Sequence, residues 1–230
     1  MIAPLLAALV ATMLDGVATV AQRNDACTAL RGERAPEIVT ALVTALPDPV
    51  VRACAARDLR EAGAVPELIG ALLSPDADSQ MAAARELGEL HDARALDALG
   101  RAALSSQTLV ASSAIAALGA YPLADSLPYL LRAAQQANVA GMQALETAAR
   151  SGDPAAVELA RRVLARGDVA AQVVALSIIG DFGDASDLPR LRQLAAHSDP
   201  VYSRGRGFGF MPPIDVARAA QTTIARIAAR

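Results

Sequence analysis

Few residues of this 230-residue chain carry side chains suited to catalysis or metal binding. The only two histidines, His91 and His197, are far apart in sequence, and each lies at a predicted helix end or loop. Neither is followed by glutamate, so the histidine–glutamate pairs of an iron site are absent. A metal site or an acid–base catalyst needs several such groups to converge. The sequence therefore predicts no catalytic residue, no cofactor, no cofactor-binding residue and no metal ligand. It predicts a solvated or helix-capping role for both histidines.

A second candidate for chemistry is the glycine-rich segment 202–213, which contains the pattern G-x-G-x-G. A loop that cradles a nucleotide phosphate needs a preceding strand and a following helix, and no strand is predicted here. The segment holds three of the chain's six aromatic residues. Either these rings cover the core of the terminal repeat, or they contact a partner together with the nearby arginines. The partner-contact candidates are Tyr202, Arg204, Arg206, Phe208 and Phe210.

The elements that must position these groups are helices. The chain is 53% hydrophobic and only 3% aromatic, with an apolar content dominated by alanine, leucine and valine. Asp48 and Pro49 have the residue types of a helix N-cap and first helical position. Apolar residues then recur at helical spacing as far as Gly63, and a second helix follows from Val65. This unit is a helical hairpin.

The hairpin recurs at a nearly constant interval. Units start near residues 48, 78, 107, 138, 168 and 199, with steps of 30, 29, 31, 30 and 31 residues. A degenerate copy precedes residue 48. We expect glycines to end the first helices, at Gly63, Gly88, Gly119, Gly152 and Gly180. The pattern predicts an all-α fold, an α-solenoid formed by a superhelical stack of about six hairpins spanning residues 19–230.

The first unit resembles the short HEAT repeats of the phycobilisome-lyase-like class. The matching residues are Asp48, Pro49, Val51, Arg52, Ala55, Ala56, Leu59, Val65, Pro66, Leu68 and Leu72. The resemblance extends over residues 16–230, although the third and fourth units lack the aspartate–proline and arginine signals. It implies a curved binding surface. Pigment-handling enzymes exist among the relatives of this class, but repeat similarity by itself does not transfer their activity.

Residues 1–18 form either a secretory signal peptide or a helix that caps the open end of the stack. Ile2–Leu14 carries no charge, but a helix of this length spans only about 20 Å, too short for a stable membrane span. Small residues at Gly16 and Ala18 suit cleavage, which favours an exported, periplasmic protein over a cytoplasmic one.

The two cysteines, Cys27 and Cys54, fall on the first helices of neighbouring units, which lie side by side in stacks of this class. Their spacing excludes a C-x-x-C redox motif. Two interpretations stay open. The cysteines form a disulfide if the chain is exported, or they are two buried thiols that behave as small apolar residues.

A second candidate contact surface is the row of second helices, where arginines outnumber acidic residues seven to four. The partner-contact candidates there are Arg161, Arg162 and Arg190. The net charge of −3 and the absence of tryptophan argue against nucleic acid as a partner. The sequence thus favours a non-enzymatic scaffold that binds a protein or peptide, with an acidic partner fitting the arginines. The alternative is a maturation or lyase-like accessory enzyme that uses a bound cofactor or pigment.

Overall fold

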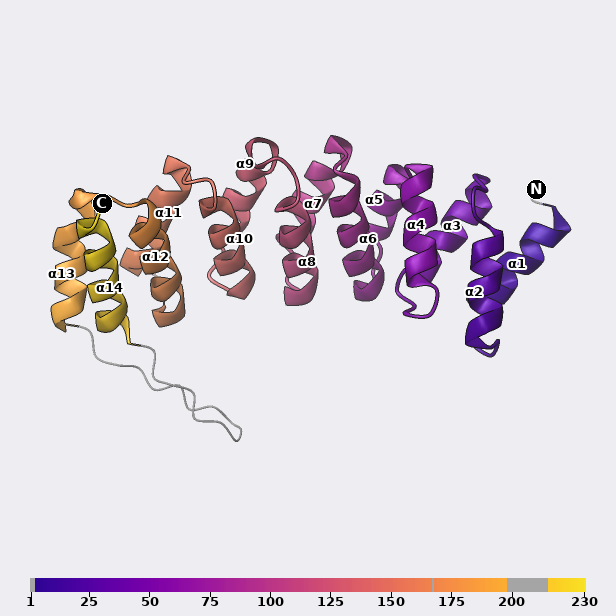
Figure 1. Ribbon diagram of the computed structural model, residues 1–230, viewed down its shortest axis with the longest axis horizontal. Coiled ribbons are helices and arrows are strands. Elements are labelled where there is room, and N and C mark those ends of the chain that lie inside the picture. The colour runs from indigo at the N-terminus through magenta and orange to yellow at the C-terminus, as the bar shows by residue number, and fades with distance from the viewer. Residues whose placement is uncertain (1–2, 167, 198–214) are drawn as a thin grey trace, which may run out of the picture. The chain divides into compact units, whose positions relative to one another are not determined.

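The computed structural model describes residues 3–166, 168–197 and 215–230, and these residues form helices and no strand (Figure 1). This confirms the predicted all-α class. The chain divides into two compact units, unit 1 (Met1–Tyr129) and unit 2 (Leu130–Arg230). Each unit is built from successive helices that pack as pairs. The predicted loop segment 202–213 lies outside the described residues.

In unit 1, helices that are neighbours in sequence pack together, and the first helices of successive repeats also pack on one another, as α6 does on α8. The core is made of leucine, alanine, isoleucine and valine side chains. The helices are α1 (Pro4–Leu14), α2 (Val20–Ala29), α3 (Pro36–Ala45), α4 (Arg52–Ala62), α5 (Val65–Leu72), α6 (Ala77–Leu90), the 3-10 turn η1 (Ala93–Ala95), α7 (Leu96–Ala102) and α8 (Thr108–Leu118). Helix α9 (Leu123–Ala133) begins in unit 1 and ends in unit 2.

Unit 2 repeats this arrangement. Helix α12 packs against α10, α11 and α14, and α14 also packs against α13. The helices of unit 2 are α10 (Val139–Ala149), α11 (Pro154–Arg166), α12 (Val169–Phe182), the 3-10 turn η2 (Ala185–Asp187), α13 (Leu188–His197) and α14 (Val216–Ala228).

The predicted unit starts near 107, 138 and 168 coincide with helix N-caps, and the start near 78 lies just after the N-cap Asp76. The start near 48 is wrong, and the start near 199 lies outside the described residues. Asn138 and Asp168 are N-caps whose side chains accept hydrogen bonds from backbone N–H groups. Asp48 is not an N-cap, because α4 begins only at Arg52. Its carboxylate instead accepts the N–H of Val50 in a turn and pairs with Arg23, whose hydrogen bond lowers the pKa of Asp48. Asp48 therefore stabilises the turn before α4 instead of capping the helix.

The expected glycine helix ends are also partly wrong. Gly63 does end α4, in the left-handed conformation with φ 63°. Gly88 and Gly180 instead lie inside α6 and α12. A Cβ on Gly88 would lie 3.0 Å from the Cα of Ala117 on α8. This glycine therefore serves close packing of neighbouring first helices rather than helix termination.

Ion pairs connect successive repeats inside each unit. Arg60 on α4 pairs with Glu86 on α6, and the Glu86 side chain is 2% exposed. Glu86 also accepts a hydrogen bond from Arg85, its neighbour on α6. An exposed pair between Arg31 and Glu61 joins the preceding repeats and contributes little, because water screens both charges. The arginines therefore neutralise buried carboxylates as well as facing solvent.

Tyr121 connects α8 to the end of α6. Its side chain is buried, and its hydroxyl donates to the carbonyl oxygen of Leu87 at 2.8 Å and lies 3.1 Å from that of Asp92. Burial and the charge of Asp92 raise the pKa of Tyr121 to about 12. The hydroxyl is therefore held in its neutral, donating form.

Replacing Tyr121 by phenylalanine should lower the free energy of unfolding by about 1–2 kcal/mol, because the buried carbonyl of Leu87 loses its donor. Wild-type stability should also decline as pH rises from about 10, the pKa of an exposed tyrosine, to about 12. The raised pKa favours folding only while the phenol is protonated. Chemical denaturation across this pH range measures both effects. An equal alkaline decline in Tyr121→Phe would contradict the assignment.

Helix α1 packs against α2 and α3, and Met13 near its end is fully buried. Arg23 on α2 is buried too, and its Nε donates to the carbonyl of Met13 at 2.9 Å. The assignment of residues 1–18 as a signal peptide or a capping helix stays a prediction. No helix in the described part of the chain combines the length and apolar character needed to cross a membrane.

Candidate functional site

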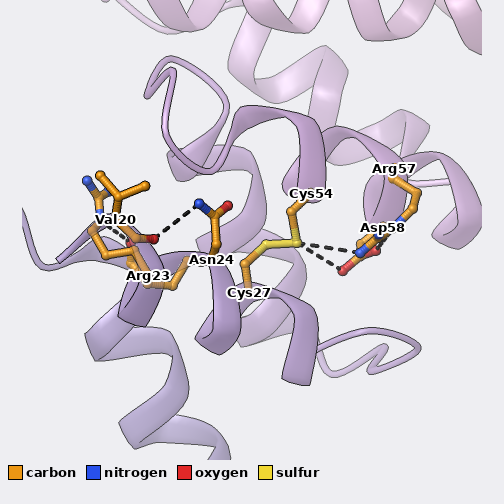
Figure 2. The surroundings of a disulfide bond; sticks show 8 residues. Val20, Arg23, Asn24, Cys27, Cys54, Arg57 and Asp58 are labelled. Atoms are coloured by element: carbon orange, nitrogen blue, oxygen red, sulfur yellow. Dashed lines mark hydrogen bonds and ion pairs between the residues drawn. A yellow bond between two sulfur atoms is a disulfide. The ribbon is translucent and has the colours of Figure 1, made fainter. Parts of the chain in front are cut away.

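The two cysteines meet in unit 1. A disulfide joins Cys27 on α2 to Cys54 on α4, with Cα atoms 6.3 Å apart (Figure 2). Helices α2 and α4 pack against each other, which is the neighbour relationship that the repeat spacing predicts. Cys27 is fully buried, whereas Cys54 is half-buried. The bond crosslinks two successive repeats.

A buried carboxylate lies beside this disulfide (Figure 2). Asp58 follows Cys54 by one helical turn on α4, and its side chain is 1% exposed. Its Oδ2 lies 3.9 Å from the Cys54 sulfur, and its Oδ1 accepts a hydrogen bond from Arg57 at 2.9 Å. Asp58 is not among the residues predicted from the sequence. The signal that could have found it is the i,i+4 spacing from Cys54, which places both residues on one helix face.

Unit 2 contains a cavity of about 340 Å³ between α10, α11 and α12, here called the α10–α12 cavity. Its apolar wall includes Met142 and Leu145 of α10 and Leu159 and Val163 of α11. Its polar rim is formed by Gln135, Gln136, Asn138, Arg162, Arg166 and Asp168. A cavity with an apolar wall and a few polar groups at its edge is typical of a ligand-binding site.

Local sequence explains how this rim forms. Asn138 caps α10 by accepting the N–H of Gly141 at 2.8 Å, and Asp168 caps α12 by accepting the N–H of Ala171 at 2.8 Å. A Cβ on Gly141 would lie 2.0 Å from the carbonyl oxygen of Gln136. Only glycine therefore allows the chain before α10 to fold this closely over the helix.

The structure separates the three arginines that the sequence grouped. Arg162 is exposed on the cavity rim, 3.9 Å from Glu158. The neighbouring Arg161 is instead paired with Asp187. Its Nε donates to Oδ1 of Asp187 at 2.8 Å, and its Nη2 donates to Oδ2 at 3.0 Å. These contacts raise the pKa of Arg161. Arg190 donates to Gln193 on α13, at 2.8 Å, and does not line the cavity.

Arg166 joins Arg162 at the rim, although it is not among the contact residues predicted from the sequence. The two arginines are one helical turn apart on α11 and both are exposed. No carboxylate among the described residues forms an ion pair with Arg166. Asp168, the one acid on the rim, already accepts a hydrogen bond at the N-terminus of α12. The rim therefore offers positive charge to a ligand.

The remaining residues predicted from the sequence are those of segment 202–213 and the two histidines. Tyr202, Arg204, Arg206, Phe208 and Phe210 lie outside the described residues, so their contact role stays a prediction. His91 follows α6, and its Nδ1 lies 3.0 Å from the backbone oxygen of Glu89. His197 is the last residue of α13. Both histidines are exposed at helix ends, as predicted.

A second cavity, of about 500 Å³, lies in unit 1 against the first helices α6 and α8. Its charged residues are two of each sign, Arg52, Arg85, Asp78 and Glu89. Much of the remaining lining is alanine and glycine. Because the charges balance, this cavity has less electrostatic preference for a partner than the α10–α12 cavity has.

Comparison with known proteins identifies the repeat. Residues 65–142 match HEAT repeats, which confirms that part of the resemblance; the phycobilisome-lyase-like class stays a prediction. No curated protein matches the chain.

Three similar solved structures are each distant from this chain. An engineered protein is 18% identical with a TM-score of 0.45, over 97% of this chain and 96% of that one. The complex of CpcE and CpcF of phycocyanin lyase from Nostoc sp. PCC7120 is 23% identical with a TM-score of 0.41, over 96% and 94%. Human deoxyhypusine hydroxylase in complex with glycerol is 15% identical with a TM-score of 0.42, over 98% and 96%.

Proposed function

We propose that this chain, whose residues 65–142 match HEAT repeats, is a non-enzymatic scaffold that binds a protein or peptide partner, and that the α10–α12 cavity is a principal contact. The observation that carries the proposal is the combination of an apolar wall with the exposed Arg162 and Arg166 at the rim. Arrays of helical repeats present extended surfaces on which such contacts are common.

The chemistry of the cavity indicates its occupant. A volume of about 340 Å³ is near the lower limit for small-ligand pockets and accommodates one or two side chains. The apolar wall favours an aliphatic or aromatic side chain, and two guanidinium groups favour a carboxylate beside it. The proposed partner therefore presents a short segment in which an apolar residue adjoins an acidic residue or a C-terminal carboxylate.

The lining does not favour catalysis. A nucleophile with an adjacent base is the usual arrangement for covalent catalysis, and none of the lining residues forms such a pair. Asp168 is the only carboxylate among them, and its Oδ1 accepts the N–H of Ala171 as the cap of α12. The groups present suit recognition by charge and apolar contact. In the proposal, segment 202–213 adds a second contact through its arginines and aromatic rings.

The proposal predicts a charge-dependent affinity for acidic–apolar peptides. Binding of the full chain to fluorescent peptides that pair one apolar residue with one or two carboxylates should exceed binding to lysine-containing counterparts. The double change Arg162→Glu/Arg166→Glu should weaken this binding about tenfold and reduce its salt dependence, because exposed pairs contribute up to about 1 kcal/mol each. Fluorescence polarisation at two salt concentrations measures both effects.

The matched control is Arg192→Glu/Arg218→Glu, which makes the same change of charge at exposed positions of unit 2 away from the cavity. It should leave peptide affinity close to wild type. Equal weakening by both double variants would mean that net charge, not the cavity, governs binding. Equal binding of acidic and basic peptides would refute the proposal.

A further inference from the structure

Three potential metal ligands converge in unit 1. The sulfurs of Cys27 and Cys54 and a carboxylate oxygen of Asp58 all lie within 4.8 Å of one another. They come from two adjacent helices, Cys27 from α2 and the other two residues from successive turns of α4 (Figure 2). Cys27 and Asp58 are buried and Cys54 is half-buried. The geometry therefore brings together two soft ligand atoms, the two sulfurs, and one hard ligand atom, the carboxylate oxygen of Asp58.

The position of Asp58 is an independent reason to expect a further ligand there. Its side chain is 1% exposed, and its Oδ2 faces the Cys54 sulfur at 3.9 Å. A disulfide sulfur carries no hydrogen, so it cannot donate to this oxygen. Arg57 donates to the other oxygen, Oδ1. Among the described residues no other group donates to Oδ2, and a buried carboxylate oxygen without a donor is costly and rare. Reduction of the disulfide removes this mismatch, because a thiol or a cation then faces Oδ2.

We propose that the reduced chain binds Zn²⁺ through the sulfurs of Cys27 and Cys54 and the carboxylate of Asp58. Thiolate and carboxylate are both zinc ligands, and three protein ligands leave the fourth tetrahedral position to water. The charges also fit. Two thiolates, one carboxylate and Zn²⁺ sum to one negative charge, and the guanidinium of Arg57 lies 3.5 Å from the Cys54 sulfur to offset it.

A dithiol reductant transfers two electrons and two protons to the Cys27–Cys54 bond, gives two thiols and leaves as a disulfide. The half-buried Cys54 is the sulfur that the reductant reaches, since Cys27 is fully buried. Zn²⁺ then binds both sulfurs as thiolates and releases two protons to solvent. The oxidised chain binds no zinc here because its sulfurs are joined.

The carboxylate of Asp58 suits zinc binding better than it suits thiol–disulfide exchange at these cysteines. The negative charge of Asp58 beside the sulfurs opposes both an approaching thiolate and the formation of a thiolate leaving group. A divalent cation reverses that effect, because it attracts all three groups. The negative charge of Asp58 therefore favours zinc binding in the reduced state, whereas it disfavours thiol–disulfide exchange.

Cobalt is the probe for this site. The full chain, reduced with a phosphine and freed of reductant under argon, should bind a single equivalent of Co²⁺. Near-ultraviolet sulfur-to-cobalt charge transfer and intense visible d–d bands should report tetrahedral sulfur coordination, and Zn²⁺ should bleach both. The oxidised chain and Cys27→Ser/Cys54→Ser should show neither band. Asp58→Asn should retain charge transfer but bind at least about tenfold more weakly.

Asp25→Asn is the matched control, since Asp25 is an exposed carboxylate on α2, two residues before Cys27. It should bind Co²⁺ like wild type. Circular dichroism on each sample checks that the helices persist. If reduction alone removes helicity, Zn²⁺ should restore it, and failure to do so overturns the proposal. The proposal is also overturned if the reduced wild-type chain shows no charge-transfer band, or if Asp58→Asn binds as tightly as wild type.

Discussion

Reduction of the Cys27–Cys54 disulfide is expected to lower the free energy of unfolding of unit 1 by about 3–4 kcal/mol. The two cysteines are 27 residues apart, and the crosslink removes conformational entropy from the unfolded chain in proportion to the logarithm of that loop length. The bond joins α2 to α4, so all of α3 lies within the closed loop. Guanidinium denaturation with and without a phosphine reductant, both with a chelator present, measures the difference.

The matched control for this prediction is Cys27→Ala/Cys54→Ala. It should unfold at the same denaturant concentration with and without the reductant, because it has no disulfide to reduce. Alkylation followed by mass analysis, without prior reduction, should find no free thiol in the oxidised wild-type chain. Two alkylated cysteines, or identical denaturation curves for the oxidised and reduced chains, would favour the alternative of two buried thiols.

The Arg161→Ala variant should lose about 2–3 kcal/mol of stability. The Asp187 side chain in η2 is 9% exposed, and Arg161 binds both of its oxygens. Removing the guanidinium leaves this carboxylate buried, with the N–H of Asp184 as its remaining donor among the described residues. The effect falls below the range for fully buried pairs because the Arg161 side chain is 32% exposed. Chemical denaturation followed by circular dichroism measures the loss.

Arg162→Ala is the matched control. Arg162 is adjacent in sequence, has the same side chain and is exposed, so its removal should change stability by no more than about 0.5 kcal/mol. The two variants should also differ in function. Arg162→Ala should weaken binding of acidic–apolar peptides, whereas Arg161→Ala should leave the affinity of the folded fraction unchanged. Equal stability of the two variants would mean that the Asp187 pair contributes nothing.

The glycine pattern shows how far sequence reasoning reaches. The nearly constant repeat interval located the first helices, and Gly63 ends α4 as expected. The same pattern misassigned Gly88, which lies inside α6 against Ala117. A glycine that ends a helix and a glycine that lets two helices approach look alike in sequence. They differ only in what surrounds them.

The sequence by itself predicted the helical class and the fact that the helices carrying Cys27 and Cys54 are neighbours, because both depend on periodicity along the chain. Tertiary structure alone decided that Arg161 binds Asp187 while Arg162 faces the cavity, and that Asp58 lies beside the sulfurs. Adjacent residues on a helix point about 100° apart. The repeat interval specifies which helices meet but not the rotation of each about its axis. That rotation is set by packing, and it decides which charges are buried in the chain and which remain for a partner.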